Sequence, residues 1–195
     1  MSSVDAHPTI VYPHYVRALD EEKAQLPSSF PREYSEEFQH ILPKLLQRGF
    51  HILTKLNNQK GNLSNISKNF VLSHPHIHVV ILRRALDGAV IYLAYVGSHV
   101  QGPSGFMHGG ATAALLDDCV SSAVLLSGPF AMTVQMNVQY RKPVPLNSVV
   151  IVEGYVEQTN GRKTVAGGKM YHPDGALYAE ATLLFVRPRL VEPKM

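Results

Sequence analysis

Hydrophobic residues are densest in one stretch near the middle of the chain, Ala111–Leu126, which is apolar on nearly every side when placed on a helix. Gly109–Gly110 before it and Gly128–Pro129 after it are typical of the two ends of a helix. Such a helix is enclosed by other structure, so we expect a sheet around it. Two carboxylates, Asp117 and Asp118, interrupt the stretch. Because a buried carboxylate costs free energy unless it is paired or used, the pattern places the candidate site here.

The segments on either side of this helix have the period of β-strands. Thr133–Lys142 alternates most clearly, with apolar residues on one side and polar residues on the other. Asp87–Gly88 and Asn160–Gly161 are hairpin signals, so most neighbouring strands are expected to be antiparallel. The pattern predicts two strands before the helix and four after it: His76–Arg84, Ala89–Gly97, Thr133–Lys142, Val149–Gln158, Lys163–Tyr171 and Ala176–Val186.

Residues 1–75 follow a different pattern, and we interpret them as an N-terminal arm in front of a domain at 76–190. Within the arm, Tyr34–Phe50 has apolar residues at helical spacing and predicts a helix. Pro43 lies inside this pattern and predicts a kink or a division into two short helices. Asn57–Asn69 is polar and rich in Gly, Ser and Asn, which is typical of a linker.

The composition narrows the class of protein. One cysteine in 195 residues excludes a disulfide framework and a zinc-finger site, and it suits a reducing compartment. The formal net charge of +3 suits an anionic ligand, but Lys and Arg are too dispersed for a nucleic-acid footprint. No uninterrupted apolar run reaches the roughly 18 residues of a membrane span. Acidic residues near the N-terminus argue against a targeting peptide, so we expect a cytoplasmic protein, with mitochondria and peroxisomes as alternatives.

The start of the apolar helix carries a short motif. His108–Gly110, with Asp117 nine positions after the histidine, resembles the signature of hotdog-fold acyl-CoA thioesterases, in the branch of the phenylacetate-pathway enzymes and small eukaryotic thioesterase-superfamily proteins. The resemblance runs from about His76 to Val186 and includes Asn137–Pro143 and Gly161–Lys163. It implies an α+β hotdog fold, in which a curled antiparallel sheet wraps one long central helix, here with an N-terminal helical extension. It also implies a homodimer, or a dimer of dimers, with active sites between subunits.

The resemblance further implies catalytic roles. Asp117 of the opposite subunit would act as general base on water, or as a nucleophile giving an anhydride. The N–H of Gly109, at the positive end of the helix, would polarise a thioester carbonyl. Thr133 matches a small hydroxyl residue that holds the water, and His108 would shape the helix start without transferring protons. Structural alternatives stay open, because Asp117 could cap a neighbouring loop and Thr133 could be an ordinary strand residue.

The substrate would be an acyl-CoA, whose acyl chain lies in an apolar tunnel beside the helix. Many relatives carry an Asn six residues before the His, where this chain has Gly102, and Gln101 is the nearest candidate substitute. Basic residues that flank the expected cleft would bind the CoA phosphates. We expect no metal and no cofactor, because coenzyme A is part of the substrate. The further binding candidates are Gly110, Asn137, Arg141, Lys142, Arg162 and Lys163.

Other candidate residues receive a structural interpretation. Asp118 is expected to make a structural hydrogen bond or to face a subunit boundary. Cys119 has no activating neighbour in sequence and is expected to behave as a small apolar residue. Alternating histidines would share one strand face, but a metal site needs a completing ligand that the neighbouring sequence lacks, so a polar strand face is preferred: His74, His76 and His78.

Three functions are compatible with this motif and the expected fold. Hydrolysis of an acyl-CoA thioester leads, because of the spacing between His108 and Asp117. A hotdog enoyl-CoA hydratase or dehydratase would need a histidine facing the substrate, whereas this histidine stands before a double glycine. A non-catalytic module that binds acyl-CoA or a protein partner is the third hypothesis. A serine hydrolase of the α/β class is disfavoured, because the sequence has no Gly-x-Ser-x-Gly motif.

Overall fold

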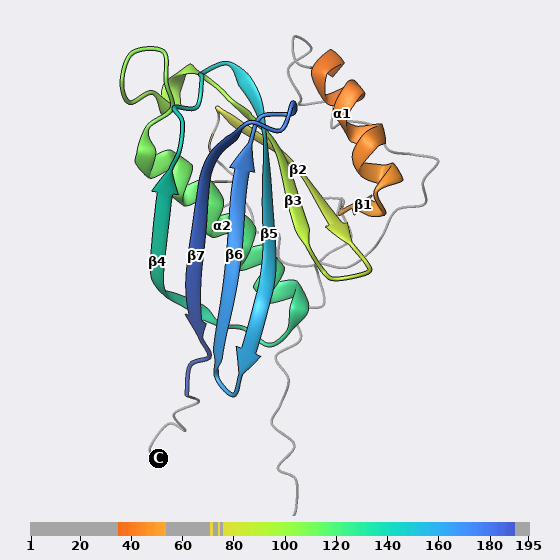
Figure 1. Ribbon diagram of the computed structural model, residues 1–195, viewed down its shortest axis with the longest axis vertical. Coiled ribbons are helices and arrows are strands. Elements are labelled where there is room, and N and C mark those ends of the chain that lie inside the picture. Colours follow the sequence, from red (N-terminus) through yellow and green to blue (C-terminus); the bar gives the residue numbers. More distant parts are fainter. Residues whose placement is uncertain (1–34, 54–70, 72–73, 75, 190–195) are drawn as a thin grey trace, which may run out of the picture.

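The computed structural model describes residues 35–53, 71, 74 and 76–189, which form a sheet and two α-helices (Figure 1). The sheet has seven antiparallel strands in the order β1-β2-β3-β5-β6-β7-β4. The predicted linker and the residues before Ser35 lie outside the described part of the chain. The elements are α1 (Ser35–Gln47), β1 (Phe50–Ile52), β2 (Ile77–Arg84), β3 (Val90–Val96), the 3-10 turn η3 (Ser98–Val100), α2 (Gly109–Ser127), β4 (Met132–Tyr140), β5 (Ser148–Asn160), β6 (Lys163–Tyr171) and β7 (Leu177–Val186).

The six predicted strands and the central helix are confirmed, and one further strand, β1, was not predicted. β1 has only three residues, too few to show a period of two, and it pairs with β2. The N-terminal helix passes through Pro43 as one element, so a division into two short helices is wrong. It ends before Gly49, whose φ of +79° suits glycine at a helix C-terminus. Both α1 and β1 therefore belong to the folded unit, although they precede the predicted boundary at residue 76.

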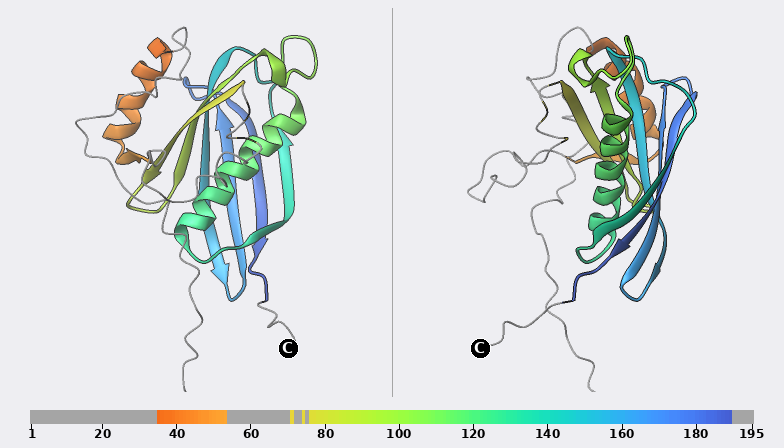
Figure 2. Two further views of the ribbon diagram at one scale, coloured as in Figure 1. Left: turned by 180° about the vertical axis from the view of Figure 1, so that it is seen from behind. Right: turned by 90° about the vertical axis from the view of Figure 1, so that its left-hand side faces the viewer.

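Strand β3 is buried on both of its faces, which places it between two hydrophobic cores. Residues that alternate along a strand point to opposite faces of the sheet. Tyr92 and Ala94 pack into the core that contains α2, whereas Ile91 and Leu93 pack into the core that contains α1. The two helices thus cover opposite faces of the sheet, and Figure 2 shows the sheet curving around α2.

The central helix packs against the sheet along one side. α2 contacts β3, β4, β5, β6 and β7. The approach is close at β5, because a Cβ on Gly154 would lie 2.8 Å from the carbonyl oxygen of Cys119. The buried side chains follow one face of the helix, from Thr112 to Val124, while Ala114 and Asp117 on the other face are half-buried. Complete enclosure was therefore the wrong expectation for a single chain, since a sheet curved from one side covers only part of a helix.

Helix α2 is also the one helix among the described residues that is long and apolar enough to cross a membrane, with a mean hydropathy of 1.3. Its packing against five strands accounts for that composition.

Strand β4 lies at the edge of the sheet, so that one row of its backbone groups has no strand partner among the described residues. Its register with β7 shifts between Thr133 and Gln135, so the clean alternation expected for this strand is interrupted by a bulge at Val134. The edge is apolar, because Met132, Val134 and Tyr140 are 56%, 58% and 56% exposed. An exposed apolar edge of this kind is a surface on which another strand can pair.

Candidate active site

The central helix and the edge strand bring Asp117 and Thr133 together. The Thr133 hydroxyl donates a hydrogen bond of 2.9 Å to Oδ1 of Asp117. Both side chains are half-buried, and the bond joins α2 to the edge strand of the sheet. This bond leaves Oδ2 of Asp117 as an acceptor for water, and a hydrogen bond to a carboxylate is stronger than one between neutral groups. Two residues that were singled out separately are therefore in contact, although their predicted roles did not include this bond, and Asp117 does not cap a loop through it.

The start of α2 is built around His108. Its backbone is extended, with φ −63° and ψ 135°, and its Nδ1 accepts the Gly110 N–H at 2.9 Å, which makes it the N-cap of the helix. Its carbonyl accepts the Thr112 N–H at 3.0 Å. Because Nδ1 accepts a hydrogen bond, the proton of the neutral imidazole lies on Nε2. His108 shapes the helix start, as predicted, and its Nδ1 is already engaged.

The two glycines of the motif serve different purposes. A Cβ on Gly110 would lie 3.0 Å from Nδ1 of His108, so a side chain there would disturb the cap. Among the described residues, the atoms nearest to a Cβ on Gly109 would be those of the Tyr140 side chain, at an ordinary distance of 3.6 Å. The chain's own packing therefore does not require glycine at position 109. Among the described residues its N–H has no acceptor, as is usual for the first residue of a helix.

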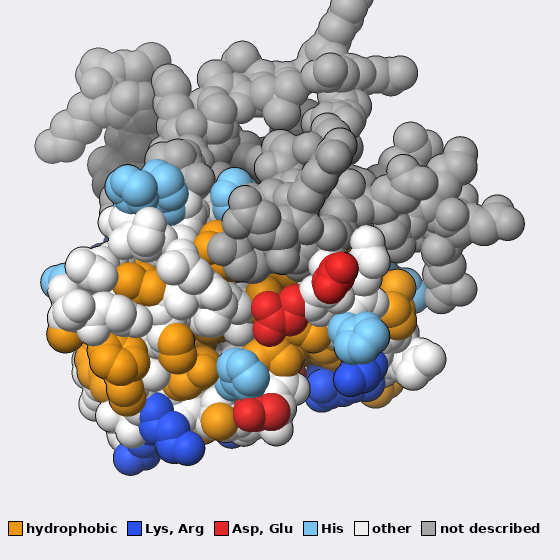
Figure 3. Space-filling view, turned by 90° about the horizontal axis from the view of Figure 1, so that it is seen from above, with side chains coloured by type: hydrophobic (Ala, Val, Ile, Leu, Met, Phe, Trp, Pro, Cys, Tyr) orange, Lys and Arg blue, Asp and Glu red, His pale blue; other side chains and the backbone are white. Residues whose placement is uncertain are grey.

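Two cavities flank the first turns of α2. The larger is about 340 Å³, and its apolar wall includes Ile77, Val100, Ala111 and Ala114. Polar side chains that line the same cavity are His74, His99, Gln101 and His108. The smaller is about 240 Å³ and is lined by Met107, Gly109, Thr112, Tyr140, Arg141, Lys142, Pro143 and Val144. Figure 3 looks onto this end of the molecule, where histidine and hydrophobic side chains gather.

The loop before α2 explains why an amide side chain stands at position 101 and not at 102. A Cβ on Gly102 would lie 2.9 Å from the Cα of His108, so an Asn does not fit there on this backbone path. Gln101 lines the larger cavity instead, and its Oε1 accepts the Gly105 N–H at 3.2 Å. Asn137, by contrast, is exposed in the middle of β4 opposite Thr182 and lines neither cavity.

The four predicted basic residues separate into two pairs. Arg141 and Lys142 line the smaller cavity, and Arg141 also forms an ion pair of 2.6 Å with Glu180. Arg162 and Lys163 lie at the β5–β6 hairpin, where Lys163 pairs with Val186, itself the partner of Met132. They therefore stand at the beginning of β4, about 25 Å along the strand from its end. The expectation that all four flank one cleft is wrong within a single chain, because the length of β4 separates them.

Asp118 makes the structural hydrogen bond that was predicted. Its Oδ2 accepts the Tyr92 hydroxyl at 2.9 Å, and the oxygen of Tyr92 lies 2.7 Å from Oγ of Ser122. Burial raises the pKa of Tyr92 well above its usual value, so the phenol keeps its proton. Asp118 thus joins α2 to β3 and is committed to the fold.

Cys119 is buried in the core. Its thiol lies 3.3 Å from the carbonyl oxygen of Val152, and burial raises its pKa well above the ordinary value. A protonated, buried thiol is not a nucleophile.

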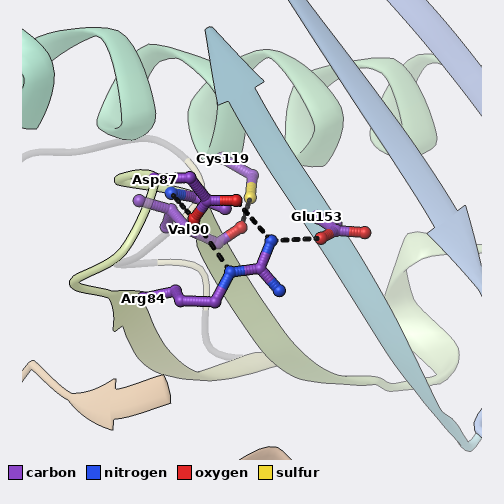
Figure 4. A network of polar contacts seen from close by, with 6 residues as sticks. Arg84, Asp87, Val90, Cys119 and Glu153 are labelled. Atoms are coloured by element: carbon purple, nitrogen blue, oxygen red, sulfur yellow. Dashed lines mark hydrogen bonds and ion pairs between the residues drawn. The ribbon is translucent and has the colours of Figure 1, made fainter. Parts of the chain in front are cut away.

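Figure 4 shows Cys119 beside the Arg84 network, in which Arg84 binds Asp87 through two hydrogen bonds and lowers the pKa of that carboxyl to about 2. Both features stabilise the sheet and take no part in the site.

The predicted row of histidines is not a continuous strand face. His76 precedes β2 and stacks on His99, with ring centroids 3.6 Å apart, whereas His78 lies within β2 and stacks near Tyr95. Burial lowers the pKa of His76, and the neighbouring His99 and His74 lower it further. Within the described part of the chain, no group of three or more His, Cys, Asp or Glu side chains is arranged to hold a metal ion.

One helix carries both Asp117 and Gly109, and this fixes the distance between them. They are eight positions apart, which corresponds to a rise of about 12 Å along the helix. A general base must lie within hydrogen-bond reach of its proton, directly or through one water. Asp117 and the Gly109 N–H of one chain therefore cannot act on the same carbonyl group.

Comparison with known proteins covers this part of the chain. Residues 104–179, which contain the start of α2, Asp117 and Thr133, match the model of the family described as Thioesterase superfamily. The chain is similar to that family over this stretch, which is less than half of its 195 residues. It is 40% identical over 92 residues to acyl-coenzyme A thioesterase THEM4 of Mus musculus, covering 47% of this chain and 40% of that protein. It is 38% identical over 100 residues to THEM4 of Xenopus laevis, covering 50% and 45%. The chain thus spans less than half of these two relatives.

Solved structures of thioesterase-superfamily proteins share the fold. One of them aligns with a TM-score of 0.57 at 24% identity, covering 87% of this chain and 82% of that one. The PaaI protein of E. coli aligns with a TM-score of 0.52 at 14% identity, covering 58% and 80%. The predicted hotdog fold is confirmed by these neighbours and by the sheet around α2.

Tyr140 lines the smaller cavity but was not among the residues predicted for the site, because in the sequence it is only one of the apolar positions of an alternating strand.

Proposed function

We propose that this chain hydrolyses an acyl-CoA thioester to a carboxylic acid and coenzyme A. The observation that carries the proposal is the hydrogen bond between Thr133 and Asp117, on a helix whose N-terminus opens between two cavities. The thioesterase THEM4 relatives support the same activity. A hydratase is less well supported, since Nδ1 of His108 holds the Gly110 N–H and caps the helix.

The proposed site combines two copies of the chain. Asp117 and Gly109 are about 12 Å apart on one helix, so the carboxylate of one copy would face the Gly109 N–H of the other. Two features of the single chain favour such a partner: the half-buried Asp117 carboxylate next to the edge strand of the sheet, and the exposed apolar residues of that strand, β4. A two-fold arrangement of identical chains makes both sites equivalent.

In the proposed reaction, the thioester carbonyl accepts the Gly109 N–H while Asp117 takes a proton from water. The water oxygen bonds to the carbonyl carbon, and the negative charge that develops on the carbonyl oxygen is stabilised at the helix N-terminus. Collapse of the tetrahedral intermediate breaks the C–S bond, and the leaving thiolate takes up the proton. Thr133 holds Oδ1 of Asp117, so that Oδ2 is directed to the water.

The two cavities suit the two halves of the substrate. The larger one has an apolar wall and a volume within the usual range of ligand sites, so we assign it to the acyl group. The smaller one carries Arg141 and Lys142, which suit the phosphates of coenzyme A. Gly109 stands at the smaller cavity and Gly110 at the larger, and this supports assigning the thioester to the space between them.

Replacing Ala114 by Leu is expected to shorten the acyl group that the enzyme accepts. Ala114 lines the larger cavity on a half-buried helical face, and Leu keeps the helix propensity while filling part of the volume. We expect kcat/KM to fall about tenfold or more for long acyl chains. The value for acetyl-CoA, measured on the same variant, serves as the control and is expected to stay unchanged. An equal loss for both substrates would show that the acyl group lies elsewhere.

The proposed activity is tested by incubating the full chain with saturated acyl-CoA esters of increasing length and measuring free thiol. Hydrolysis predicts one thiol released for each acid formed. An enoyl-CoA that is hydrated without thiol release would indicate the hydratase, and tight binding without turnover would indicate the non-catalytic module. Either of these outcomes would overturn the proposal.

A further inference from the structure

The peptide group between Gly109 and Gly110 is held at both ends by side chains. The hydroxyl of Tyr140 donates a hydrogen bond of 3.0 Å to the Gly109 carbonyl. The Gly110 N–H donates to Nδ1 of His108 at 2.9 Å. A peptide group is planar, so it cannot rotate about its flanking bonds without lengthening one of these contacts. One bond comes from the end of β4 and the other from the residue that caps the helix.

This arrangement matters because the next group along the chain is the Gly109 N–H. Two consecutive glycines have wide conformational freedom, and the first turn of a helix is the part that frays. A donor that stabilises an oxyanion acts well only when it is already oriented before the reaction. The His108 carbonyl, in the same peptide group as the Gly109 N–H, accepts from Thr112 and fixes the other side. The freedom of the glycines is thus restricted by two side chains, Tyr140 and His108, in addition to the first backbone hydrogen bond of the helix.

Packing in the hydrophobic core does not account for the position of Tyr140. It is 56% exposed at the last position of an edge strand, so its ring contributes little to the core. The ring lies 3.6 Å from where a Gly109 side chain would begin, against the motif itself. The strand that supplies Tyr140 also supplies Thr133, which holds Asp117 from the other end of β4. One strand therefore supports both the predicted base and the predicted oxyanion donor.

We propose that Tyr140 is a positioning residue for this site: its hydroxyl fixes the Gly109–Gly110 peptide group and thereby orients the Gly109 N–H toward the thioester carbonyl. The inference rests on the proposed thioesterase function and goes beyond it, because Tyr140 acts through Gly109 and not on the substrate. In the two-copy site, Tyr140 of a chain orients the donor of one site, and Thr133 of that chain orients the base of the other.

The test is Tyr140→Phe, which keeps the ring and removes the hydroxyl. Loss of one hydrogen bond to the oriented peptide is expected to lower kcat by about threefold to tenfold, while KM stays the same. Tyr95→Phe is the matched control, because it removes a hydroxyl that donates a hydrogen bond of 3.0 Å to Asn147. Neither of these two residues lines the larger or the smaller cavity. An unchanged kcat in Tyr140→Phe, or a raised KM with unchanged kcat, would overturn the proposal, and the second result would place Tyr140 on coenzyme A.

A second measurement separates this inference from the proposed function. In NMR spectra of the full chain, Tyr140→Phe is expected to shift the carbonyl carbon of Gly109 and to speed hydrogen exchange at the Gly110 amide, whereas Tyr95→Phe leaves both unchanged. If the wild-type chain released no thiol, the proposed function would fail while these signals still decided whether Tyr140 holds the peptide. Signals that match those of wild type in Tyr140→Phe would contradict the inference whatever the activity.

Discussion

Replacing Asp117 by Asn is expected to lower kcat for thioester hydrolysis by about a hundredfold to ten-thousandfold, the usual contribution of a positioned general base. The amide keeps the size of the side chain and still accepts the Thr133 hydroxyl at Oδ1, so the fold should be preserved. What is lost is the ability to take a proton from water. The measurement is the rate of thiol release at saturating acyl-CoA, together with the melting temperature of the variant.

Asp118→Asn is the matched control for this experiment. It makes the same chemical change one position along the helix, where the side chain binds Tyr92 and the amide oxygen can still accept that hydroxyl. Turnover close to that of wild type is expected. If Asp117→Asn were as active as wild type, or if Asp118→Asn lost as much activity, the role assigned to Asp117 would be wrong.

Replacing Gly109 by Pro is expected to lower kcat by about a hundredfold to a thousandfold, the effect of removing one oxyanion donor. Proline lacks the N–H but suits this position, because the first residue of a helix has no N–H partner within the helix. The residue before proline must be extended, and His108 already has φ −63° and ψ 135°. The substitution thus removes the donor with little strain on the backbone.

Gly109→Ala separates the donor from the space around it. It keeps the N–H, and its Cβ meets the Tyr140 ring at an ordinary 3.6 Å. We expect this variant to retain much more activity than Gly109→Pro, at the same thermal stability. Equal activity of the alanine and proline variants would mean that the N–H does not contribute to the reaction.

Much of the fold could be predicted because its signals are local. The apolar run of α2, the alternation of the strands and the hairpin turns each depend on neighbouring residues, and the structure confirms them. Strand β1 was not predicted, because three residues are too few to show the alternation of a strand. The bulge at Val134 escaped because a register shift depends on the partner strand, which is far away in sequence.

The site was predicted in part, for the same reason. Asp117 and Thr133 were each singled out through the resemblance, as base and as the residue that holds the water, but the hydrogen bond between them was not predicted. Tyr140 was missed because its contact with Gly109 joins the end of a strand to the start of a helix 31 residues earlier. The sequence alone does not give the distance between residues on different strands. Lys163 was therefore predicted to bind the same phosphates as Lys142, although the two lie near opposite ends of β4.

In the proposed dimer each site uses Asp117 of one copy and Gly109 of the other. Mixing two variants that are inactive alone shows whether the sites are shared in this way. Asp117→Ala and Gly109→Pro are each expected to be nearly inactive alone. After subunit exchange, half of the dimers are mixed, and each mixed dimer has one site in which both residues are intact. Activity should therefore return to about one quarter of the wild-type value. A mixture that stays as inactive as its components, although exchange is shown by mass labelling, would contradict the two-copy site.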